Sequence, residues 1–193
     1  MRFPSPAQIH PRQTGVNEFD WKSVILSLAP FLFIMNIILL RKIKLSDKSY
    51  FAKWWKDTEL LKLTSGILRR ISDKNVDKYF QNILKTKHDY HFMIVLKNKT
   101  IGHISLVKRR SERYETQIII GEKKYWGKGY GSKAIKILMN KAKRLRISKI
   151  YLEVRPTNVR AIRAYERCGF RKIKIIQYSK NKYLPKTLRM GLK

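Results

Sequence analysis

Three glycines on alternate positions constrain this chain more than any other feature of its sequence. Gly127, Gly129 and Gly131 stand in the segment EKKYWGKGYGSKAIKILMNKAKRL, residues 122–145, of a chain with only nine glycines. Glycine has no Cβ atom, so alternate glycines let the backbone approach a ligand closely while the amide N–H groups point into one concavity. The segment therefore predicts an anion-binding loop, with a purely structural turn as the alternative.

An amphipathic helix follows the glycines. The apolar stripe that we expect it to bury consists of Ile135, Leu138, Met139, Ala142 and Leu145. A helix docked in this way fixes its N-terminus, near Gly131 and Ser132, as a ready pyrophosphate site. Two nucleotide motifs are excluded, because Ser132 stands where a dinucleotide fingerprint needs its third glycine, and GKGYGS lacks the Gly-Lys-Ser/Thr order of a P-loop.

Strands and helices alternate along the rest of the chain. Strands are expected at 36–44, 91–97, 99–109, 114–121, 149–154, 170–178 and 186–192. Helices are expected at 47–57, 72–87, 131–145 and 158–168. The cap and turn residues that set these boundaries are Ser46 or Asp47, Ser72 or Asp73, Asn98-Lys99 and Gly169. Such a mixture predicts an α/β domain with a mixed sheet.

The N-terminal region permits two interpretations. Ser23 to Leu40 carry no charge over eighteen residues, the lower limit of a membrane-spanning helix, and the basic flank at 41–44 would keep the rest of the protein on the cytoplasmic side. Pro30 and Asn36 interrupt this run, and the chain from Asn36 onward has the pattern of a strand. We therefore expect a domain at 35–193 and a dispensable N-terminal extension at 1–34, apolar or disordered or derived from an upstream start. A membrane anchor and a signal peptide are the less favoured alternatives.

Composition narrows the environment and the chemistry. The single cysteine, Cys168, excludes an intramolecular disulfide, and four scattered histidines give no metal-ligand spacing, so we expect no metal. We interpret Cys168 as a small buried side chain and His88 and His91 as surface residues. A reducing cytoplasm is the expected location. The formal charge of +31 fits an anionic partner, and equally a general lysine-rich composition.

Two motifs together resemble a known family. The glycine segment, followed by a strand and by RPTNVRAIRAYERCGF at 155–170, resembles the GCN5-related N-acetyltransferases (GNAT), in particular the branch that includes the ribosomal-protein acetyltransferases RimJ and RimL. The resemblance covers roughly residues 36–193. It implies one GNAT-type domain, with a mixed, mostly antiparallel sheet of about seven strands flanked by about four helices. It also implies direct transfer of an acetyl group from acetyl-CoA to a primary amine.

The resemblance further implies where the cofactor binds. In that family the main chain of the glycine loop holds the pyrophosphate of coenzyme A, and the strand before the loop splays from its neighbour to expose main-chain groups to the pantetheine arm. The implied residues are Ile118, Ile119, Ile120, Trp126, Gly127, Lys128, Gly129, Tyr130, Gly131, Ser132, Asn158 and Tyr165. Trp126 stands where relatives usually carry Arg or Gln, a departure also familiar within this branch.

Acetyl transfer needs a neutral amine and a proton for the departing thiolate. Asn158 and Tyr165 lie seven residues apart on one expected helix, so both can reach the same ligand. By resemblance, Tyr165 is the general acid and Asn158 binds the cofactor arm or a water; a packing role is the alternative for Tyr165. Glu115 matches a position at which relatives often carry an acid that accepts the amine's proton, although a solvated carboxylate explains it equally well. Glu153 is the second candidate base.

The acceptor is expected between the first two helices, around KWWKDTE, and the segment 178–183. Trp54, Trp55, Asp57 and Glu59 are the candidates for holding an amine, although at least one tryptophan suits the core. Protein N-termini, aminoglycosides, polyamines and amino-acid derivatives all remain open as acceptors. The charge favours a basic protein tail presented on RNA, as on a ribosome. The alternative function is a basic nucleic-acid- or ribosome-binding module that retains the fold, and both a monomer and a homodimer are compatible with the sequence.

Overall fold

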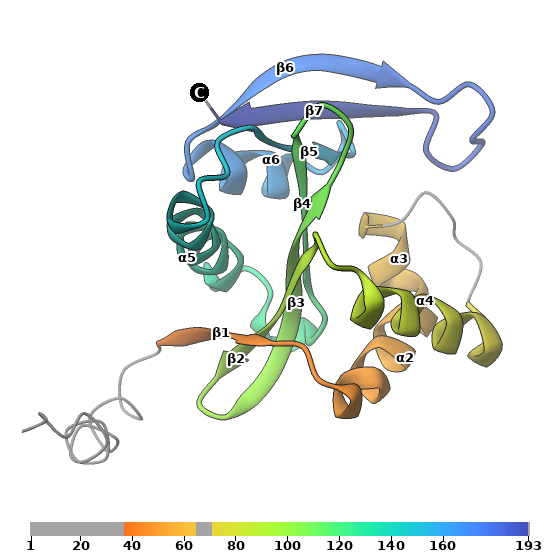
Figure 1. Cartoon of the computed structure of the whole chain (residues 1–193). Coiled ribbons are helices and arrows are strands. Elements are labelled where there is room, and N and C mark those ends of the chain that lie inside the picture. Colours follow the sequence, from red (N-terminus) through yellow and green to blue (C-terminus); the bar gives the residue numbers. More distant parts are fainter. Residues whose placement is uncertain (1–36, 65–70, 193) are drawn as a thin grey trace, which may run out of the picture. The chain divides into compact units, whose positions relative to one another are not determined.

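The computed structural model describes residues 37–64 and 71–192. In these residues seven strands form one sheet in the order β1-β2-β3-β4-β5-β7-β6 (Figure 1). The strands are β1 (Ile38–Lys42), β2 (Tyr90–Leu96), β3 (Lys99–Lys108), β4 (Tyr114–Ile120), β5 (Ile150–Val154), β6 (Phe170–Gln177) and β7 (Lys186–Leu192). All neighbouring strands are antiparallel except β4 and β5, which are parallel. The predicted mixed, mostly antiparallel sheet is therefore confirmed.

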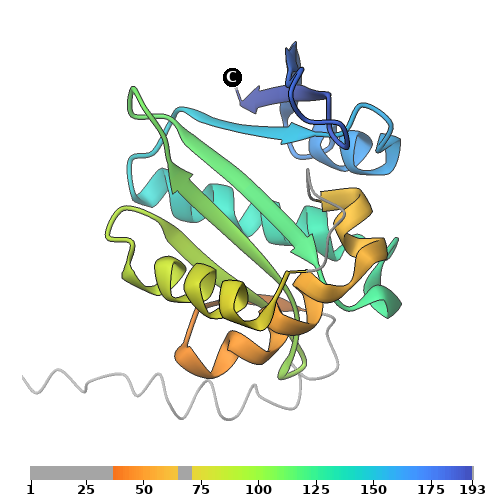
Figure 2. The ribbon, with the colours of Figure 1, turned by 90° about the vertical axis from the view of Figure 1, so that its right-hand side faces the viewer.

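Helices cover both faces of the sheet. The described residues form α2 (Lys48–Lys56), α3 (Thr58–Thr64), α4 (Asp73–Lys85), α5 (Tyr130–Arg144) and α6 (Val159–Glu166), with two 3-10 helices, η1 (Leu45–Asp47) and η2 (Lys123–Tyr125). Helices α5 and α6 lie on one face, and α2, α3 and α4 lie on the other (Figures 1 and 2). The two groups of helices thus enclose the sheet as a central layer.

One α-helix more than the four predicted is present in the described residues, because Asp57 divides the segment after β1. Asp57 has an extended backbone, with φ −78° and ψ 106°, which ends α2. Its carboxylate then accepts the main-chain N–H groups of Glu59, at 3.0 Å, and Leu60, at 3.2 Å. These bonds satisfy donors that have no partner within a helix, so Asp57 begins α3 as well as ending α2.

Two apolar layers, one on each side of the sheet, form the core. Alternation along β2 sends Ile94 into the layer under α5 and Met93 into the layer under α2 and α4, and neither side chain is exposed to solvent. Phe51 and Phe80 complete the second layer. Burial of each such side chain stabilises the fold by about 1.5–3 kcal/mol, so both layers hold the sheet that carries the site.

An ion pair beside β1 replaces the helix cap predicted at Ser46 or Asp47. Asp47 occupies the N-cap position of α2 but forms no side-chain bond to that helix. Its carboxylate instead receives both terminal nitrogens of Arg41, at 2.8 and 2.9 Å, and the main-chain N–H of Lys44 at 2.7 Å. Burial alone would raise the pKa of Asp47, but these bonds outweigh it and the pKa is lowered. The carboxylate therefore anchors the segment between β1 and α2.

Two further predicted boundaries differ in detail. Leu145 lies at the C-cap of α5 and is exposed, so it does not belong to the buried stripe of that helix. The turn between β2 and β3 falls at Lys97 and Asn98, one residue earlier than predicted. Both residues have positive φ angles, 46° and 62°, as a two-residue hairpin turn requires.

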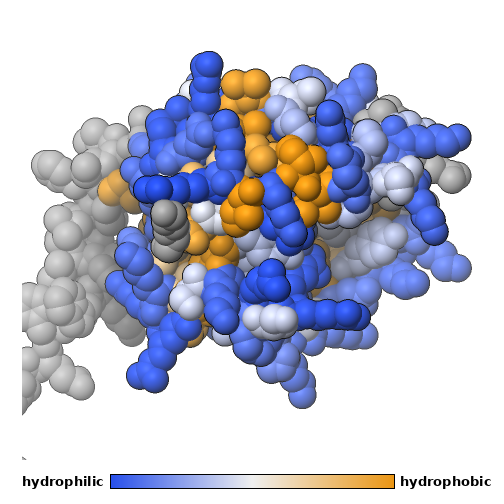
Figure 3. Space-filling view, turned by 90° about the horizontal axis from the view of Figure 1, so that it is seen from above, coloured by the Kyte–Doolittle hydropathy of each residue, from blue (hydrophilic) through white to orange (hydrophobic). Residues whose placement is uncertain are grey.

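The edge strand β6 is charged on its exposed side. Arg171, Lys172 and Lys174 flank the exposed apolar residues Ile173 and Ile175. Seen from above, over β6 and β7, the surface is mostly hydrophilic with apolar groups between the charges (Figure 3). Lysines and arginines on an edge strand oppose pairing with a second chain, so this composition protects the free edge.

The apolar run proposed as an alternative membrane anchor ends inside the sheet. Ile38, Leu39 and Leu40 belong to β1, where they pair with Leu96, Val95 and Ile94 of β2. The rest of that run, and the expected extension at 1–34, lie outside the described residues. Among the residues that are described, none of the helices combines the length and hydropathy needed to cross a membrane.

Candidate active site

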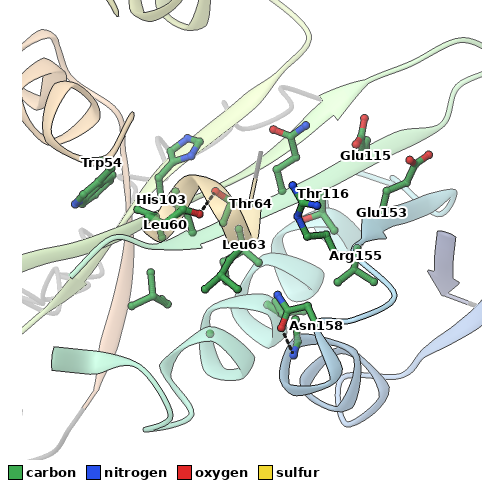
Figure 4. A pocket seen from close by; sticks show the side chains of 18 of the residues that line it. Trp54, Leu60, Leu63, Thr64, His103, Glu115, Thr116, Glu153, Arg155 and Asn158 are labelled. Carbon is green, nitrogen blue, oxygen red and sulfur yellow. Dashed lines mark hydrogen bonds between the residues drawn. The ribbon is translucent and has the colours of Figure 1, made fainter. Parts of the chain in front are cut away.

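A cavity of about 900 Å³ opens where β4 and β5 separate. The two strands are paired at only two positions, Tyr114 with Ile150 and Glu115 with Tyr151. Beyond Glu115 the strands diverge, and the edge of β4 that faces β5 is left without a strand partner. The cavity extends to both sides of this gap, so residues from the two helical layers line it (Figure 4).

The cavity brings together nearly all the residues that the resemblance implied. Its lining includes Glu115, Asn158 and Tyr165, the three main-chain positions of β4 at 118–120, and the glycine loop. Lys128 is the exception, because its side chain is exposed and does not line the cavity. The residues thus converge on one space, although they come from segments far apart in the chain.

The three glycines of the loop differ in backbone conformation and in the space that a Cβ atom would have. Gly127 and Gly129 have left-handed backbones, with φ of 75° and 78°, and a Cβ atom at either position would meet nothing within 4 Å. Gly129 is also the N-cap of α5. Gly131 lies in the first turn of that helix, and a Cβ atom there would sit 3.9 Å from a methyl group of Ile118. The first two glycines are therefore needed for backbone conformation, and they leave open space in front of the helix N-terminus.

Trp126 fastens the glycine loop to the end of β4. Its indole Nε1 donates a hydrogen bond of 2.6 Å to the main-chain oxygen of Ile120. The guanidinium carbon of Arg160, in α6, lies 5.1 Å from the centre of the Trp126 ring. The loop, the strand and α6 are thus connected through this one indole, and Arg160 is a cavity-lining cation that the sequence motifs did not single out.

Two lysines connect the turn before the loop to the helices of the opposite layer. Lys123 contacts the carboxylates of Asp57 at 3.0 Å and Glu59 at 2.5 Å. Glu122 receives Lys53 at 2.6 Å and the indole Nε1 of Trp54 at 3.2 Å. The prediction that Asp57 and Glu59 hold the acceptor amine is therefore not supported, because Lys123 already pairs with both.

The two tryptophans of KWWKDTE have different surroundings. Trp54 is 1% exposed and packs in the core, and a Cβ atom on Gly121 would overlap its ring. Trp55 is half-buried and lines the cavity. The expectation that at least one tryptophan belongs to the core is confirmed by Trp54.

Tyr165 and Asn158 stand at the two ends of α6. Asn158 is the N-cap rather than a helical residue, and its Oδ1 accepts the N–H of Ala161 at 3.2 Å. The Tyr165 ring packs against Phe170, with 6.1 Å between ring centres, and its hydroxyl has no hydrogen-bond partner among the described residues. Burial, with a smaller effect of Cys168, raises the pKa of Tyr165 to about 12. The phenol is thus held protonated at neutral pH.

Both candidate bases form ion pairs. Glu115 receives Nε and a terminal nitrogen of Arg109, each at 2.8 Å. Glu153 receives Arg189 at 2.7 Å, the hydroxyl of Tyr178 at 2.7 Å and that of Thr187 at 2.6 Å. Burial alone would raise the pKa of Glu153, but these hydrogen bonds outweigh it and the pKa is lowered. Figure 4 shows both carboxylates toward one end of the cavity.

Two histidines at the other end of the cavity form a pair that the sequence did not predict. His91 Nδ1 lies 3.2 Å from His103 Nε2, with 15° between the ring planes. His103 is buried against the edge of Phe51, and burial, aided by His91, lowers the pKa of His103 to about 3. His91 is half-buried, so it is less exposed than predicted, and burial lowers its pKa, whereas His88 is exposed as expected. The predicted hairpin could have indicated this histidine pair, because it joins the two strands on which the two residues lie.

Cys168 connects the two helices of the cofactor side. Its Sγ donates to the main-chain oxygen of Ser132, in the first turn of α5, at 3.5 Å. The side chain is half-buried, and burial raises the pKa of its thiol. In the described residues, clusters of three or more metal-ligating side chains are absent.

A family model described as an acetyltransferase (GNAT) domain matches residues 38–171. The chain belongs to the GNAT family of acetyltransferases. Acetyl-CoA is the cosubstrate of this family, and the open space at Gly127 and Gly129 fits a bound pyrophosphate. The matched range contains β4, the glycine loop and α6.

Several solved structures share the fold. A spermidine N-acetyltransferase from Vibrio cholerae, in complex with CoA and spermine, is 20% identical with a TM-score of 0.70, over 80% of this chain and 94% of that one. An aminoglycoside acetyltransferase AAC(6')-Ib, in complex with coenzyme A and kanamycin, is 18% identical with a TM-score of 0.68, over 81% and 95%. A domain from Methanocaldococcus jannaschii is 19% identical with a TM-score of 0.68, over 81% and 99%.

A curated relative matches a smaller region. This uncharacterised protein of Methanocaldococcus jannaschii is 27% identical over 76 residues, which are 39% of this chain and 16% of that protein. The chain thus spans a minor part of the length of that relative.

Proposed function

We propose that this acetyltransferase transfers an acetyl group from acetyl-CoA to a primary amine by direct attack, with Tyr165 as general acid. The observation that carries the proposal is the convergence of the glycine loop, Asn158 and Tyr165 on the gap between β4 and β5. A cofactor arm lying in that gap would have the helix N-terminus at one end and the protonated phenol near the other.

The main chain would hold most of the cofactor. The N–H groups from Gly127 to Ser132 would form the pyrophosphate cradle, because those at the start of α5 have no partner within the helix, whereas the N–H of Trp126 already donates to the main-chain oxygen of Lys123. The free edge of β4 at 118–120 would offer main-chain groups to the pantetheine arm, as a strand edge does to an added strand. The amide of Asn158 keeps its N–H₂ group for the same arm, since only its oxygen caps α6.

The proposed chemistry needs two groups of the protein, a general acid and a carboxylate that acts as the base. Bound acetyl-CoA supplies a thioester whose acetyl group goes to the amine nitrogen and whose sulfur leaves. Tyr165 would give its proton to that sulfur, because its pKa of about 12 keeps the phenol protonated below that pH. Glu115 or Glu153 would accept the amine's proton directly or through water, and each carboxylate has an arginine partner, Arg109 for Glu115 and Arg189 for Glu153.

The acceptor half favours an amine that is not a polycation. The carboxylates that could hold an amine all pair with cations of the chain itself. They are those of Glu115, Glu153, Asp57 and Glu59. Arg155 also lines the cavity, with Nη1 donating to the main-chain oxygen of Tyr183 at 2.9 Å. We therefore propose a protein N-terminus or another monoamine as the acceptor, in keeping with the RimJ/RimL-like branch. A ribosome or another anionic partner, and a cytoplasmic location, belong to the same proposal and agree with the charge of +31.

Calorimetric titration of acetyl-CoA into the full-length chain tests the cofactor part of the proposal. We expect micromolar binding that Gly129→Val weakens about thirtyfold. A panel of spermidine, kanamycin and short peptides with free N-termini then tests the acceptor, and we expect turnover with the peptides alone. A folded protein that does not bind acetyl-CoA would contradict the enzymatic proposal. Affinity for ribosomal RNA at low salt that decreases as salt rises would then favour a basic binding module.

A further inference from the structure

We propose that Arg160, stacked on Trp126, is the side chain that binds the pyrophosphate of acetyl-CoA. This inference rests on the proposed acetyl-CoA site and adds a residue that the loop motif does not contain. Its starting point is Trp126, at the opening of the glycine loop. The only polar atom of the indole is a donor, and that donor is already bonded to the oxygen of Ile120. Trp126 therefore has no polar group left for a phosphate.

Arg160 is placed to supply the missing charge. Its guanidinium lies over the Trp126 ring, with 5.1 Å between the guanidinium carbon and the ring centre, and the side chain lines the same cavity as Gly127 and Gly129. Within residues 37–64 and 71–192, the guanidinium forms no hydrogen bond and no ion pair. An arginine stacked on an aromatic face keeps its N–H edge available, and that planar edge matches two phosphate oxygens.

The lysines around the loop are less well placed. Lys123 is already paired with Asp57 and Glu59. Lys124 and Lys133 lie over the rings of Tyr125 and Tyr130, and, with Lys128, they are absent from the described lining of the cavity. Arg167 lines the cavity, but it follows the C-terminal end of α6, where the helix dipole is negative. Arg160 alone combines a place in the cavity with a fixed platform beside the glycines.

The position of Arg160 in its helix supports an anionic ligand. Arg160 is the second residue of α6, which begins at Val159 and has no acidic residue in its first turn. A cation at that end opposes the helix dipole, so the arginine lowers the stability of the helix unless an anion binds there. A pyrophosphate bound here would interact favourably with the guanidinium and with the N-terminal end of α6. It would thereby offset the unfavourable interaction between Arg160 and the helix dipole.

Arg160→Gln tests the proposal, because it removes the charge while keeping the length of the side chain. The dissociation constant of acetyl-CoA should rise about tenfold, since a hydrogen-bonded ion pair is lost. Arg163→Gln is the matched control: Arg163 is an exposed residue of the same helix that does not line the cavity, and its substitution should leave the affinity unchanged. Without cofactor, thermal unfolding of Arg163→Gln should match that of the parent protein, and Arg160→Gln should be equally stable or slightly more stable.

Two cofactor analogues identify the phosphate that is bound. Acetyl-dephospho-CoA keeps the pyrophosphate and lacks the 3'-phosphate, so the tenfold effect of Arg160→Gln should persist with it. Acetyl-pantetheine has neither group, and the parent protein and Arg160→Gln should turn it over equally well. An effect that disappears with acetyl-dephospho-CoA would assign Arg160 to the 3'-phosphate and overturn the proposal.

Substitution of the platform supplies a second check. Trp126→Leu removes both the ring under Arg160 and the bond to Ile120, so we expect it to weaken acetyl-CoA binding, and the loss in the double variant should be smaller than the sum of the two single losses. Fully additive effects would show that the two side chains act separately, against the proposal. If the parent protein itself binds no acetyl-CoA, the proposed function fails together with this inference. If it binds and Arg160→Gln binds equally well, this inference alone fails.

Discussion

The two ends of the cavity are built in different ways. On the cofactor side, the groups that would meet the ligand are mostly main-chain groups of the glycine loop and β4, and their positions follow from two short motifs. On the acceptor side, the groups are side chains that depend on partners far away in the sequence, such as Glu153 with Arg189 and His91 with His103. A common acetyl donor can therefore be recognised from local sequence, whereas recognition of the acceptor depends on side-chain pairs that only the fold brings together.

The largest effect is expected where the two sides meet, at Tyr165. Tyr165→Phe removes the proton that the departing sulfur would receive and should lower kcat about a hundredfold, the lower range for general acid catalysis. The affinity for acetyl-CoA should stay the same, because the ring still packs against Phe170. Steady-state kinetics and calorimetry on the same samples measure both quantities. An unchanged kcat would return Tyr165 to a packing role.

A main-chain effect should dominate on the cofactor side. Gly129→Val forces a branched side chain into a backbone with φ of 78°. Strain of this kind costs about 2 kcal/mol, or roughly thirtyfold in the dissociation constant of acetyl-CoA. Gly131→Ala is the control, because that residue is helical and its Cβ would have room beside Ile118. If both variants lose the same affinity for acetyl-CoA, the left-handed backbone at Gly129 is not what cofactor binding requires.

On the acceptor side, the largest effect should depend on pH. The pKa of His103 is about 3 in the folded protein and near 6.5 when unfolded, so the unfolded state takes up the proton first as pH falls. The contribution of His103 to the free energy of unfolding is fully present above pH 6.5. It is lost as the pH decreases, by about 2 kcal/mol between pH 7.5 and pH 5.

Urea unfolding of the parent protein and of His103→Gln at the two pH values measures this change. The variant should lose less stability than the parent protein over this interval, and His88→Gln, at an exposed position, should behave like the parent protein. The same loss in His103→Gln as in the parent protein would assign the acid sensitivity to another group, such as His91, whose pKa burial also lowers from about 6.5.

The smallest effect is expected from the contacts that join the two sides. Lys123→Gln breaks exposed ion pairs with Asp57 and Glu59, and such pairs contribute little, so the affinity for acetyl-CoA should fall by about threefold at most. Calorimetry at low and high salt measures the change, and high salt should reduce the difference from the parent protein. A loss comparable with that of Gly129→Val would mean that α3 determines the conformation of the loop.

Much of the fold could be predicted because its signals are local. Alternation in KIYLEV and the hairpin at 91–109 predicted strands, and Gly169, with φ of 91°, ends the helix that contains Tyr165 as expected. The separate helix α3 was missed because aromatic spacing in FAKWWK suggested one helix, while the carboxylate of Asp57 could end one helix and begin another. The spacing of apolar residues gives little indication of such a boundary, because one polar side chain, that of Asp57, both ends one helix and begins the next.

The acceptor side could not be predicted for a different reason. Glu115 has the position of a catalytic base in sequence, but its partner Arg109 lies across the turn between β3 and β4. His91 and His103 meet only because β2 and β3 pair in a register interrupted by a bulge between Ile94 and Val95. Ionisation and proton affinity depend on these contacts, so they follow from tertiary structure and not from residue type.

The bonds from Lys53 and Lys123 to the opposite layer have one further consequence. They connect the turn that leads into the glycine loop with the helices that border the acceptor site. If binding of the acyl donor shifts this turn, the affinity for the amine changes by some factor, and the amine must then change the affinity for the donor by the same factor. In that case the two substrates of this acetyltransferase would be thermodynamically linked through surface ion pairs, and the strength of that link should decrease as salt is added.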